Sequence, residues 1–374
     1  MNNIGLYIHI PFCQKKCLYC DFNSYEGKTN KAEAYIEALI KEINLYQLDN
    51  KFNFKTIFIG GGTPTLINCF FIGKIVEAVK ENIQTDTEIS IECNPGTLNG
   101  KSLEAYKSFG INRLSIGLQA WQDHLLQSIG RIHSREDFLN SFKEARAAGF
   151  DNINVDLMFA LPGQTMEMWE ETLNEVCKLG VEHISCYSLK LEEGTKLYDM
   201  QKEGEIMMPD EDMDREMYHK AVDILNSYGL KQYEISNFAK PGFQCKHNLV
   251  YWRNEEYLGA GAGSHSKLFR KRFWNVSTIN DYIETINAGK LPVLGQEQLN
   301  KEDNMWESLF LGLRLNEGVN IKEFEMKYQI DFFQKYGKKL DYLIKNDLLM
   351  QTNENIKLAS KGRDLSNIVF VELS

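Results

Sequence analysis

Three cysteines near the start of the chain have a spacing that suits a metal centre. Cys13, Cys17 and Cys20 form a C-x3-C-x2-C pattern within the stretch YIHIPFCQKKCLYCDF, so one short loop can aim three thiolates at a single site. Because a four-iron cluster is normally held by four cysteines, a trio without an obvious fourth indicates that one iron is left for another ligand. The alternatives are a zinc knuckle or plain buried thiols, although zinc sites usually show paired C-x2-C units and a fourth ligand.

The elements that would position this loop alternate along the chain. Short β-rich runs and amphipathic helical stretches follow one another through about residue 235. The expected strands are residues 6–10, 56–59, 88–92, 113–117, 153–158 and 183–189, with helices such as 31–48 and 71–83 between them. Six or seven such units with right-handed crossovers predict an α/β fold built on a partial or complete (β/α) barrel, although an open sheet has a similar pattern.

Polar residues lie where these strands end, which is the end of a barrel that carries function. Gly60 to Gly62 follow one strand, and glycine lets a ligand approach the backbone closely, although glycine triplets also make ordinary turns. Glu92, Gln119, Arg131 and Asp156 fall at or just after strand ends. Each alone is as consistent with a capping or solvated residue, but together they indicate a polar ligand.

These motifs resemble those of a known superfamily. The cysteine motif resembles the cluster-binding motif of radical S-adenosylmethionine (SAM) enzymes, and GGGTPT resembles their segment for the methionine amino group. The stretches YIHIPFC, SIECNP, RLSIGLQ and NVDLMFALPG are similar to the oxygen-independent coproporphyrinogen III oxidase family and its heme-chaperone relatives. The resemblance implies that the three cysteines hold a 4Fe-4S cluster and that SAM completes the open iron. It implies SAM contacts from Tyr7, Phe22, Gly61, Gly62, Thr63, Glu92, Gln119, Arg131 and Asp156.

Two features favour the heme-chaperone branch of this family. The oxidases carry a fourth cysteine two positions after the third, where this chain has Phe22, and the run HNLVYW at residues 247–252 resembles the HNxxYW hallmark of the chaperones. Imidazole can bind heme iron, and flat rings can lie against a macrocycle. The resemblance therefore implies heme contacts, which are His247, Asn248, Tyr251 and Trp252, with His265 of a glycine-rich turn in reserve. The alternative is a buried histidine beside core aromatic residues.

The character of the chain changes near residue 291. We expect a barrel domain of residues 1–290, with a heme-motif extension at about 230–275, and a C-terminal domain of residues 291–374. Helices at 305–315, 321–328 and 332–344, followed by a hairpin of residues 348–351 and 356–358, predict a small, mainly helical, winged-helix-like module of the type that the coproporphyrinogen oxidases carry. Acidic residues slightly outnumber basic ones there, so no DNA-binding face is expected.

Composition limits the partners. The 374 residues carry a net charge of −10, which argues against nucleic acid. No apolar run approaches the length of a membrane span and the start lacks the features of a signal peptide, so we expect a cytoplasmic protein. The resemblance implies heme and client apo-hemoproteins as partners, a homodimer, and peripheral membrane association through clients.

The sequence thus predicts a heme chaperone that binds a 4Fe-4S cluster and SAM and transfers heme to apo-hemoproteins. Two alternatives remain open. One is an oxygen-independent coproporphyrinogen III oxidase, in which a radical derived from SAM starts an oxidative decarboxylation. The other is a non-catalytic iron-sulfur module with a sensing or structural role, because an open iron need not be catalytic.

Overall fold

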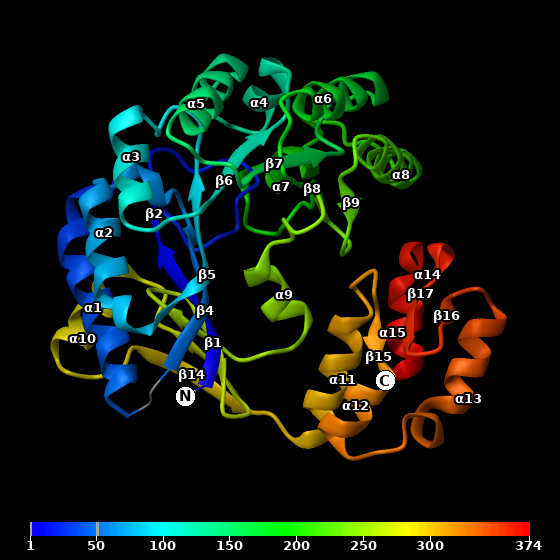
Figure 1. The fold of residues 1–374 in the computed structure, drawn as a ribbon. Coiled ribbons are helices and arrows are strands. Elements are labelled where there is room, and N and C mark those ends of the chain that lie inside the picture. Colours follow the sequence, from blue (N-terminus) through cyan, green and yellow to red (C-terminus); the bar gives the residue numbers. More distant parts are fainter. Residues whose placement is uncertain (1, 50–51) are drawn as a thin grey trace.

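A computed structural model describes residues 2–49 and 52–374. Six parallel strands form the centre of its large sheet, and they neighbour one another in chain order (Figure 1). They are β1 (Asn2–Ile10), β4 (Phe52–Gly61), β5 (Ile83–Cys93), β6 (Arg113–Gln119), β7 (Ile153–Phe159) and β8 (His183–Ser188). The connections carry α1 (Ala32–Asp49), α2 (Cys69–Ala78), α3 (Gly100–Ser108), α4 (Asp123–Ser128), α5 (Arg135–Ala147) and α6 (Met166–Lys178). The predicted alternation of strands and helices is confirmed.

Short strands extend this sheet at both edges. β11 (Tyr257–Ala260) lies parallel to β1, and β12 (His265–Leu268), β13 (Lys271–Asn275) and β14 (Val293–Gln298) continue from it in antiparallel pairs. At the other edge, β10 (Asn237–Ala239) and β9 (Lys231–Gln232) lie antiparallel beyond β8. No strand pairing joins the two edges within the described ranges, so the barrel is partial.

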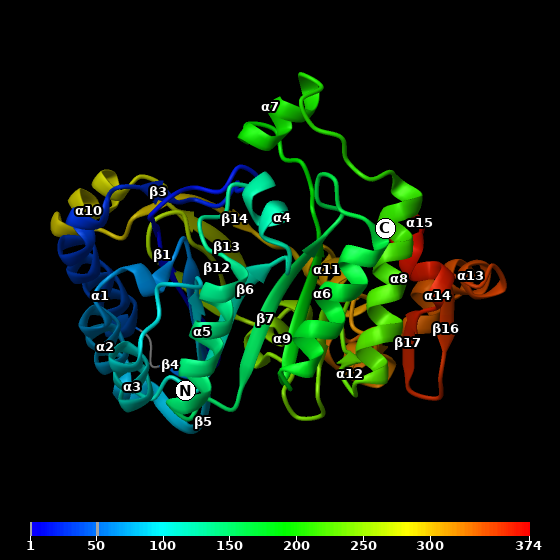
Figure 2. The same cartoon turned by 90° about the horizontal axis from the view of Figure 1, so that it is seen from above.

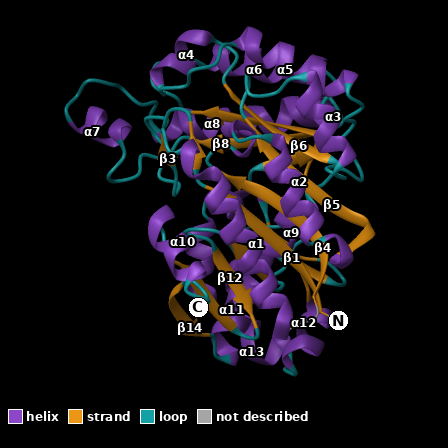
Figure 3. Cartoon of the chain, turned by 90° about the vertical axis from the view of Figure 1, so that its left-hand side faces the viewer, coloured by secondary structure: helices purple, strands orange, loops and turns teal. Residues whose placement is uncertain are grey.

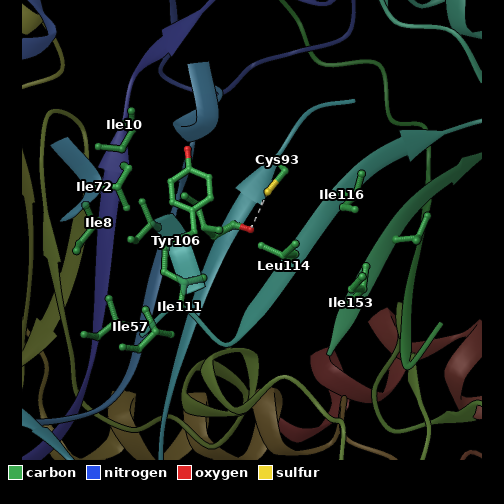
Figure 4. Packing of buried hydrophobic residues seen from close by; sticks show 14 of the residues in the cluster. Ile8, Ile10, Ile57, Ile72, Cys93, Tyr106, Ile111, Leu114, Ile116 and Ile153 are labelled. Carbon is green, nitrogen blue, oxygen red and sulfur yellow. Dashed lines mark hydrogen bonds between the residues drawn. The ribbon is translucent and has the colours of Figure 1, made fainter. Parts of the chain in front are cut away.

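The central strands are apolar because each has helices on one face and the barrel interior on the other. Ile8, Ile57, Ile116 and Ile153 come from four of these strands and belong to one buried cluster with Ile72 of α2 (Figure 4). None of the five is exposed. Burying an aliphatic side chain of this size stabilises the fold by about 1.5–3 kcal/mol, so the cluster gives the site a rigid support.

The segment between the two sheet edges crosses the open side of the barrel. After α8 (Glu211–Ser227) the chain forms β9 and β10, then α9 (Lys246–Trp252) within the curve of the sheet, then β11 at the far edge (Figure 1). Glu88 of β5 accepts the backbone amides of Lys246 and His247 at 3.1 and 3.2 Å, and so caps the first turn of α9. The expected heme-motif extension is therefore divided between both edges and the helix that lies between them.

The C-terminal domain has its own buried core, which begins at Met305. α11 (Lys301–Gly312), α12 (Ile321–Tyr328) and α13 (Phe332–Lys345) lie within a few residues of the three expected helices. The expected hairpin is β16 (Leu349–Gln351) and β17 (Asn355–Leu358), and β15 (Val319–Asn320) pairs with β17. Two helices that were not expected, α14 (Ser360–Asp364) and α15 (Ser366–Leu373), follow it.

The predicted domain boundary at residue 290 needs correction. β14 lies beyond that residue but pairs with β13 of the large sheet. Pro292 precedes an edge strand here, a position that proline tolerates because it donates no ladder hydrogen bond, and it does not mark a linker. α10 (Ile279–Asn287), which packs on α1, also belongs to the large domain. Among the described residues no helix is both long and apolar enough to cross a membrane.

Candidate functional site

The cysteine loop leaves the carboxyl end of β1, where β2 (Phe12–Cys13) pairs with β3 (Tyr25–Glu26) across its base. Cys13 is buried, whereas Cys17 and Cys20 are half-buried. Burial raises the pKa of Cys20, and the charges of Cys17 and Cys13 raise it further. The fold therefore brings the three expected ligands together.

The arrangement of these thiols suits a cluster better than a single ion. Among the described residues, no three side chains of His, Cys, Asp or Glu could hold one metal ion. The sulfur ligands of a single zinc ion lie about 2.3 Å from it, whereas a four-iron cluster takes thiolates at separate, more distant corners. Three thiols on one partly open loop fit a 4Fe-4S cluster with one free iron.

A projecting segment covers one side of the cysteine loop. Residues 189–210, here called the α7 arm, contain α7 (Lys196–Lys202) and extend from the body of the molecule (Figures 2 and 3). Leu197 is fully buried and donates its backbone N–H to the carbonyl of Leu18 at 2.9 Å. Leu18 in turn donates its backbone N–H to the carbonyl of Ile129 at 3.0 Å. The arm and the loop thus share a small apolar cluster apart from the main core.

Arg131 places a positive charge beside the cysteine loop. Its Nη1 lies 3.6 Å from the Cys17 sulfur, and its Nη2 donates to the Asn94 side chain at 2.9 Å and the Gly117 carbonyl at 2.7 Å. Gln119 ends β6 with a φ of 73°. A Cβ on Gly117 would lie 2.9 Å from Gln119 Nε2 and 3.1 Å from Arg131 Nη2, so both side chains crowd this glycine. These contacts orient a cation that can stabilise a thiolate.

The glycine-rich turn after β4 packs against the cysteine loop. Gly61 has a φ of 117° and donates its N–H to the Glu92 carboxylate at 2.9 Å. A Cβ on Gly62 would lie 2.9 Å from the Cys13 sulfur, and the Thr63 hydroxyl lies 3.9 Å from the same sulfur. Glycine is therefore required where this turn packs against the cysteine loop.

Glu92 and Asp156 face the barrel interior from β5 and β7. Burial raises the pKa of Glu92 to about 7, and the charge of Asp156 adds to the rise. Burial also raises the pKa of Asp156, although Asn154 and Ser115 donate hydrogen bonds to its carboxylate at 2.8 and 3.0 Å. Two such acids can balance a cationic ligand, which fits the sulfonium group of SAM.

Two cavities open within and beside the barrel. The inner cavity, of about 170 Å³, lies over α9 and is lined by Arg113, Asp156 and His247 among others. The outer cavity, of about 340 Å³, lies toward β11 and β12 and is lined by Phe22 and His265 among others. The two share three lining residues, which are Tyr7, Glu92 and Tyr251.

Phe22 lies on the outer cavity together with Tyr7, Gly61 and Glu92, three of the other expected SAM contacts. Its side chain is 63% exposed and lines the outer cavity, and Lys16 donates to its carbonyl at 3.0 Å. Phe22 therefore borders the solvent side of the cysteine loop. Tyr7 lies deeper, and its hydroxyl hydrogen-bonds His9 Nδ1 at 2.9 Å, while His9 Nε2 bonds the carbonyl of Asn23 at 2.7 Å. This chain of bonds fixes the end of the cysteine loop.

The residues of the HNxxYW motif do not share one accessible face. His247 is buried, with Nδ1 2.9 Å from the Thr56 hydroxyl and Nε2 2.9 Å from the Tyr251 hydroxyl. Burial lowers the pKa of His247 to about 3. Asn248 and Tyr251 line the inner cavity, whereas Trp252 turns toward the C-terminal domain, with the guanidinium of Arg314 5.6 Å from its ring. In this structure both nitrogens of His247 have hydrogen-bond partners and are not free for iron.

His265 has the exposure that His247 lacks. Its side chain is exposed on β12, stacks on Trp274 of β13 with ring centres 5.9 Å apart, and lines the outer cavity. Two basic residues, Arg270 and Lys271, lie at the end of the β12–β13 hairpin that is farther from His265.

The sequence motifs did not identify Arg113 as a site residue. It opens β6, is 2% exposed and lines the inner cavity. A charged residue at the head of an otherwise buried strand was the available signal, but a strand-opening arginine is equally common at a protein surface. Tyr187 and Ser185 of β8 also line this cavity, and no motif had marked them.

Residues 7–176 match the radical SAM superfamily, and residues 299–365 match the HemN C-terminal domain. A solved structure of coproporphyrinogen III oxidase (HemN) from Escherichia coli is similar over 100% of this chain and 90% of that one, with a TM-score of 0.86 at 23% identity. Fold and site together define a radical SAM protein with a HemN-type C-terminal domain. This class implies a 4Fe-4S cluster and SAM as cofactors.

Curated relatives narrow the class. The heme chaperone HemW of Bacillus subtilis (strain 168) is 39% identical over 97% of both chains, and that of Lactococcus lactis is 37% identical over 97% of this chain and 95% of its own. The mitochondrial radical S-adenosyl methionine domain-containing protein 1 of Mus musculus is 33% identical over 96% and 84%. The chain belongs to the HemW family.

Proposed function

We propose that this protein is a heme chaperone, which binds heme in the outer cavity and transfers it to apo-hemoproteins. The observation that carries the proposal is the composition of this cavity beside the cysteine loop. Phe22 and Tyr257 supply aromatic rings, and His265 supplies an exposed imidazole. A flat iron macrocycle can bind to both kinds of group, the rings against its face and the imidazole at its iron. The full-length likeness to relatives named heme chaperones supports the same reading.

The cluster and SAM would lie at the carboxyl end of the barrel. Cys13, Cys17 and Cys20 would hold the cluster, whose free iron would bind the amino and carboxylate groups of SAM. Arg131 would stabilise the thiolate of Cys17, which its Nη1 approaches to 3.6 Å. The predicted SAM contacts lie around the cysteine loop and the two cavities, and they stay predictions. They are Tyr7, Phe22, Gly61, Gly62, Thr63, Glu92, Gln119, Arg131 and Asp156.

For the heme iron we propose His265 in place of His247, the first choice from sequence. His247 would have to break two hydrogen bonds and leave the barrel interior before it could bind iron. His265 needs neither change, since it is exposed and held by Trp274.

A hemin titration of the anaerobically reconstituted protein tests the proposal. We expect saturable binding, followed by absorbance, which His265→Ala weakens about tenfold while the cluster absorbance is kept. His219→Ala is the matched control, because His219 is a partly exposed histidine on α8 that pairs with Asp364. A wild-type protein that binds no hemin contradicts the chaperone. If His265→Ala and wild type bind hemin with equal affinity, His265 is not the ligand of the heme iron.

Transfer to clients and the oxidase alternative need separate measurements. Heme-loaded protein should reconstitute an apo-hemoprotein faster than heme-loaded albumin, the control heme donor, does. Incubation of the reduced protein with SAM and coproporphyrinogen III should give no decarboxylated product.

A homodimer and peripheral membrane association through clients stay predictions.

A further inference from the structure

The guanidinium of Arg113 is a buried cation that makes no direct contact with a protein anion. Burial lowers the pKa of Arg113, and the more distant charges of Cys245 and Glu88 outweigh this effect and raise it. Its Nε is fully buried without a hydrogen bond, and no ion pair or side-chain hydrogen bond of Arg113 is found among the described residues. Buried charges in proteins are normally paired, because removing an unpaired charge from water costs several kcal/mol. Buried N–H groups are normally hydrogen-bonded, so a guanidinium on a cavity wall whose N–H groups make no hydrogen bond indicates a missing acceptor.

The acids near Arg113 are bonded to other groups. Glu88 accepts the amides of α9 and the thiol of Cys245, the last at 3.5 Å. Asp156 accepts hydrogen bonds from two side chains of β6 and β7, and Glu92 accepts the amide of Gly61. None of the three lies within 4 Å of the guanidinium as an ion pair.

The inner cavity has a size and lining that suit a small anionic group. Its volume of about 170 Å³ is below that of typical small-molecule pockets, which hold about 300–1,000 Å³. It can therefore admit a short side chain but not a macrocycle. Ser185 and Asn248 add polar groups beside Arg113. A guanidinium presents two parallel N–H groups, which match the two oxygens of a carboxylate.

We propose that Arg113 binds a carboxylate of the ligand, and that this carboxylate is a propionate side chain of the tetrapyrrole. The assignment rests on the proposed function. The macrocycle would stay in the outer cavity, and the propionate would reach inward past Tyr7 and Tyr251, which line both cavities. Glu92 and Asp156 also line the inner cavity, so a carboxylate can enter only where Arg113 offsets their charge.

Hemin and its dimethyl ester form the matched pair of ligands for the test, because the ester keeps the iron and the ring but has no carboxylate. Wild-type protein should bind hemin at least tenfold more tightly than the ester. Arg113→Met should remove this preference, because it should weaken the binding of hemin but not that of the ester. Arg253→Met, at an exposed ion pair with Glu317, is the control and should keep the preference.

The stability of the ligand-free variant separates a binding role from a structural one. Because the guanidinium of Arg113 makes no hydrogen bond or ion pair in the ligand-free protein, Arg113→Met should keep a melting temperature close to that of wild type. If it unfolds instead, Arg113 supports the fold and the proposal is overturned. Arg113→Lys keeps the positive charge but loses the two parallel N–H groups, so it should retain only part of the preference for hemin.

Failure of this assignment can be told from failure of the proposed function. Hemin and ester binding with equal affinity overturns the role of Arg113 and leaves the chaperone standing. If neither ligand binds, the chaperone is contradicted, and ¹³C-labelled propionate observed by NMR, with propionamide as the uncharged control, tests Arg113 directly. Loss of propionate binding in Arg113→Met supports the carboxylate site, and unchanged binding overturns it.

Discussion

Single buried acids make the molecule sensitive to pH. Glu92 lies inside the barrel, where burial first and the charge of Asp156 second raise its pKa to about 7 from an ordinary value near 4.5. Between pH 4.5 and about 7 the carboxyl of Glu92 is protonated in the folded protein but ionised in the unfolded chain, so folding takes up a proton. Stability contributed by this group falls as the pH rises through that window and stays low above it.

We expect Glu92→Gln to be more stable than wild type at pH 8 and to lose that advantage at pH 5. The neutral amide can still accept the N–H of Gly61 but has no charge to desolvate. The difference at pH 8 is at most about 3 kcal/mol. Urea unfolding of the ligand-free protein at both pH values measures it, and Glu104→Gln, an exposed position on α3, is the control. A pH-independent difference for Glu92→Gln would contradict the assignment.

At the scale of the elements, the α7 arm packs in a small cluster apart from the main core and contacts the cysteine loop. Leu197 connects the two through its buried side chain and its N–H bond to Leu18. Removing this side chain leaves a cavity that costs about 2–5 kcal/mol, mostly within the small cluster that the arm and loop share. The loop should then open more often.

We therefore expect Leu197→Ala to release cluster iron to a chelator several-fold faster than wild type under anaerobic conditions. Loss of the cluster absorbance measures the rate. Met207→Ala is the control on the same arm, because its side chain is 85% exposed and its removal leaves no cavity. Equal release from Leu197→Ala and wild type would show that the arm does not hold the loop.

At the scale of the whole molecule, local patterns predict the barrel well. The six parallel strands were visible because each is a short apolar run between helical patterns, and the cysteines, Glu92 and Asp156 meet because parallel strands end on one side. The path of α9 could not be predicted, because a seven-residue helix inside a barrel has no local signal. His247 was expected to contact heme, with a buried histidine as the alternative, and the structure shows both of its ring nitrogens hydrogen-bonded, to Thr56 and Tyr251.

The two domains are joined by a charged contact that the sequence also could not show. Glu307 of α11 pairs with Arg272 of β13 at 2.7 Å and with Lys267 of β12 at 3.5 Å. Lys267 is almost fully buried, and burial lowers its pKa to about 8. The C-terminal domain thus rests on cations supplied by the edge strands of the large sheet.

Glu307→Ala should uncouple the domains. It leaves the buried ammonium of Lys267 without its carboxylate, and breaking a buried pair in this way costs about 3–5 kcal/mol. Arg272 keeps a second partner, Glu297, so the loss falls mainly on the lysine. We expect thermal unfolding to split into two transitions and limited proteolysis to cut between β14 and α11, as identified by mass spectrometry. Glu302→Ala is the control, because Glu302 pairs with Lys335 inside the C-terminal domain. A single transition in Glu307→Ala, with the cleavage pattern of wild type, would mean that other contacts, such as the hydrogen bonds of Lys267 and Asn254 to Asn304 of α11, hold the domains together without the ion pair.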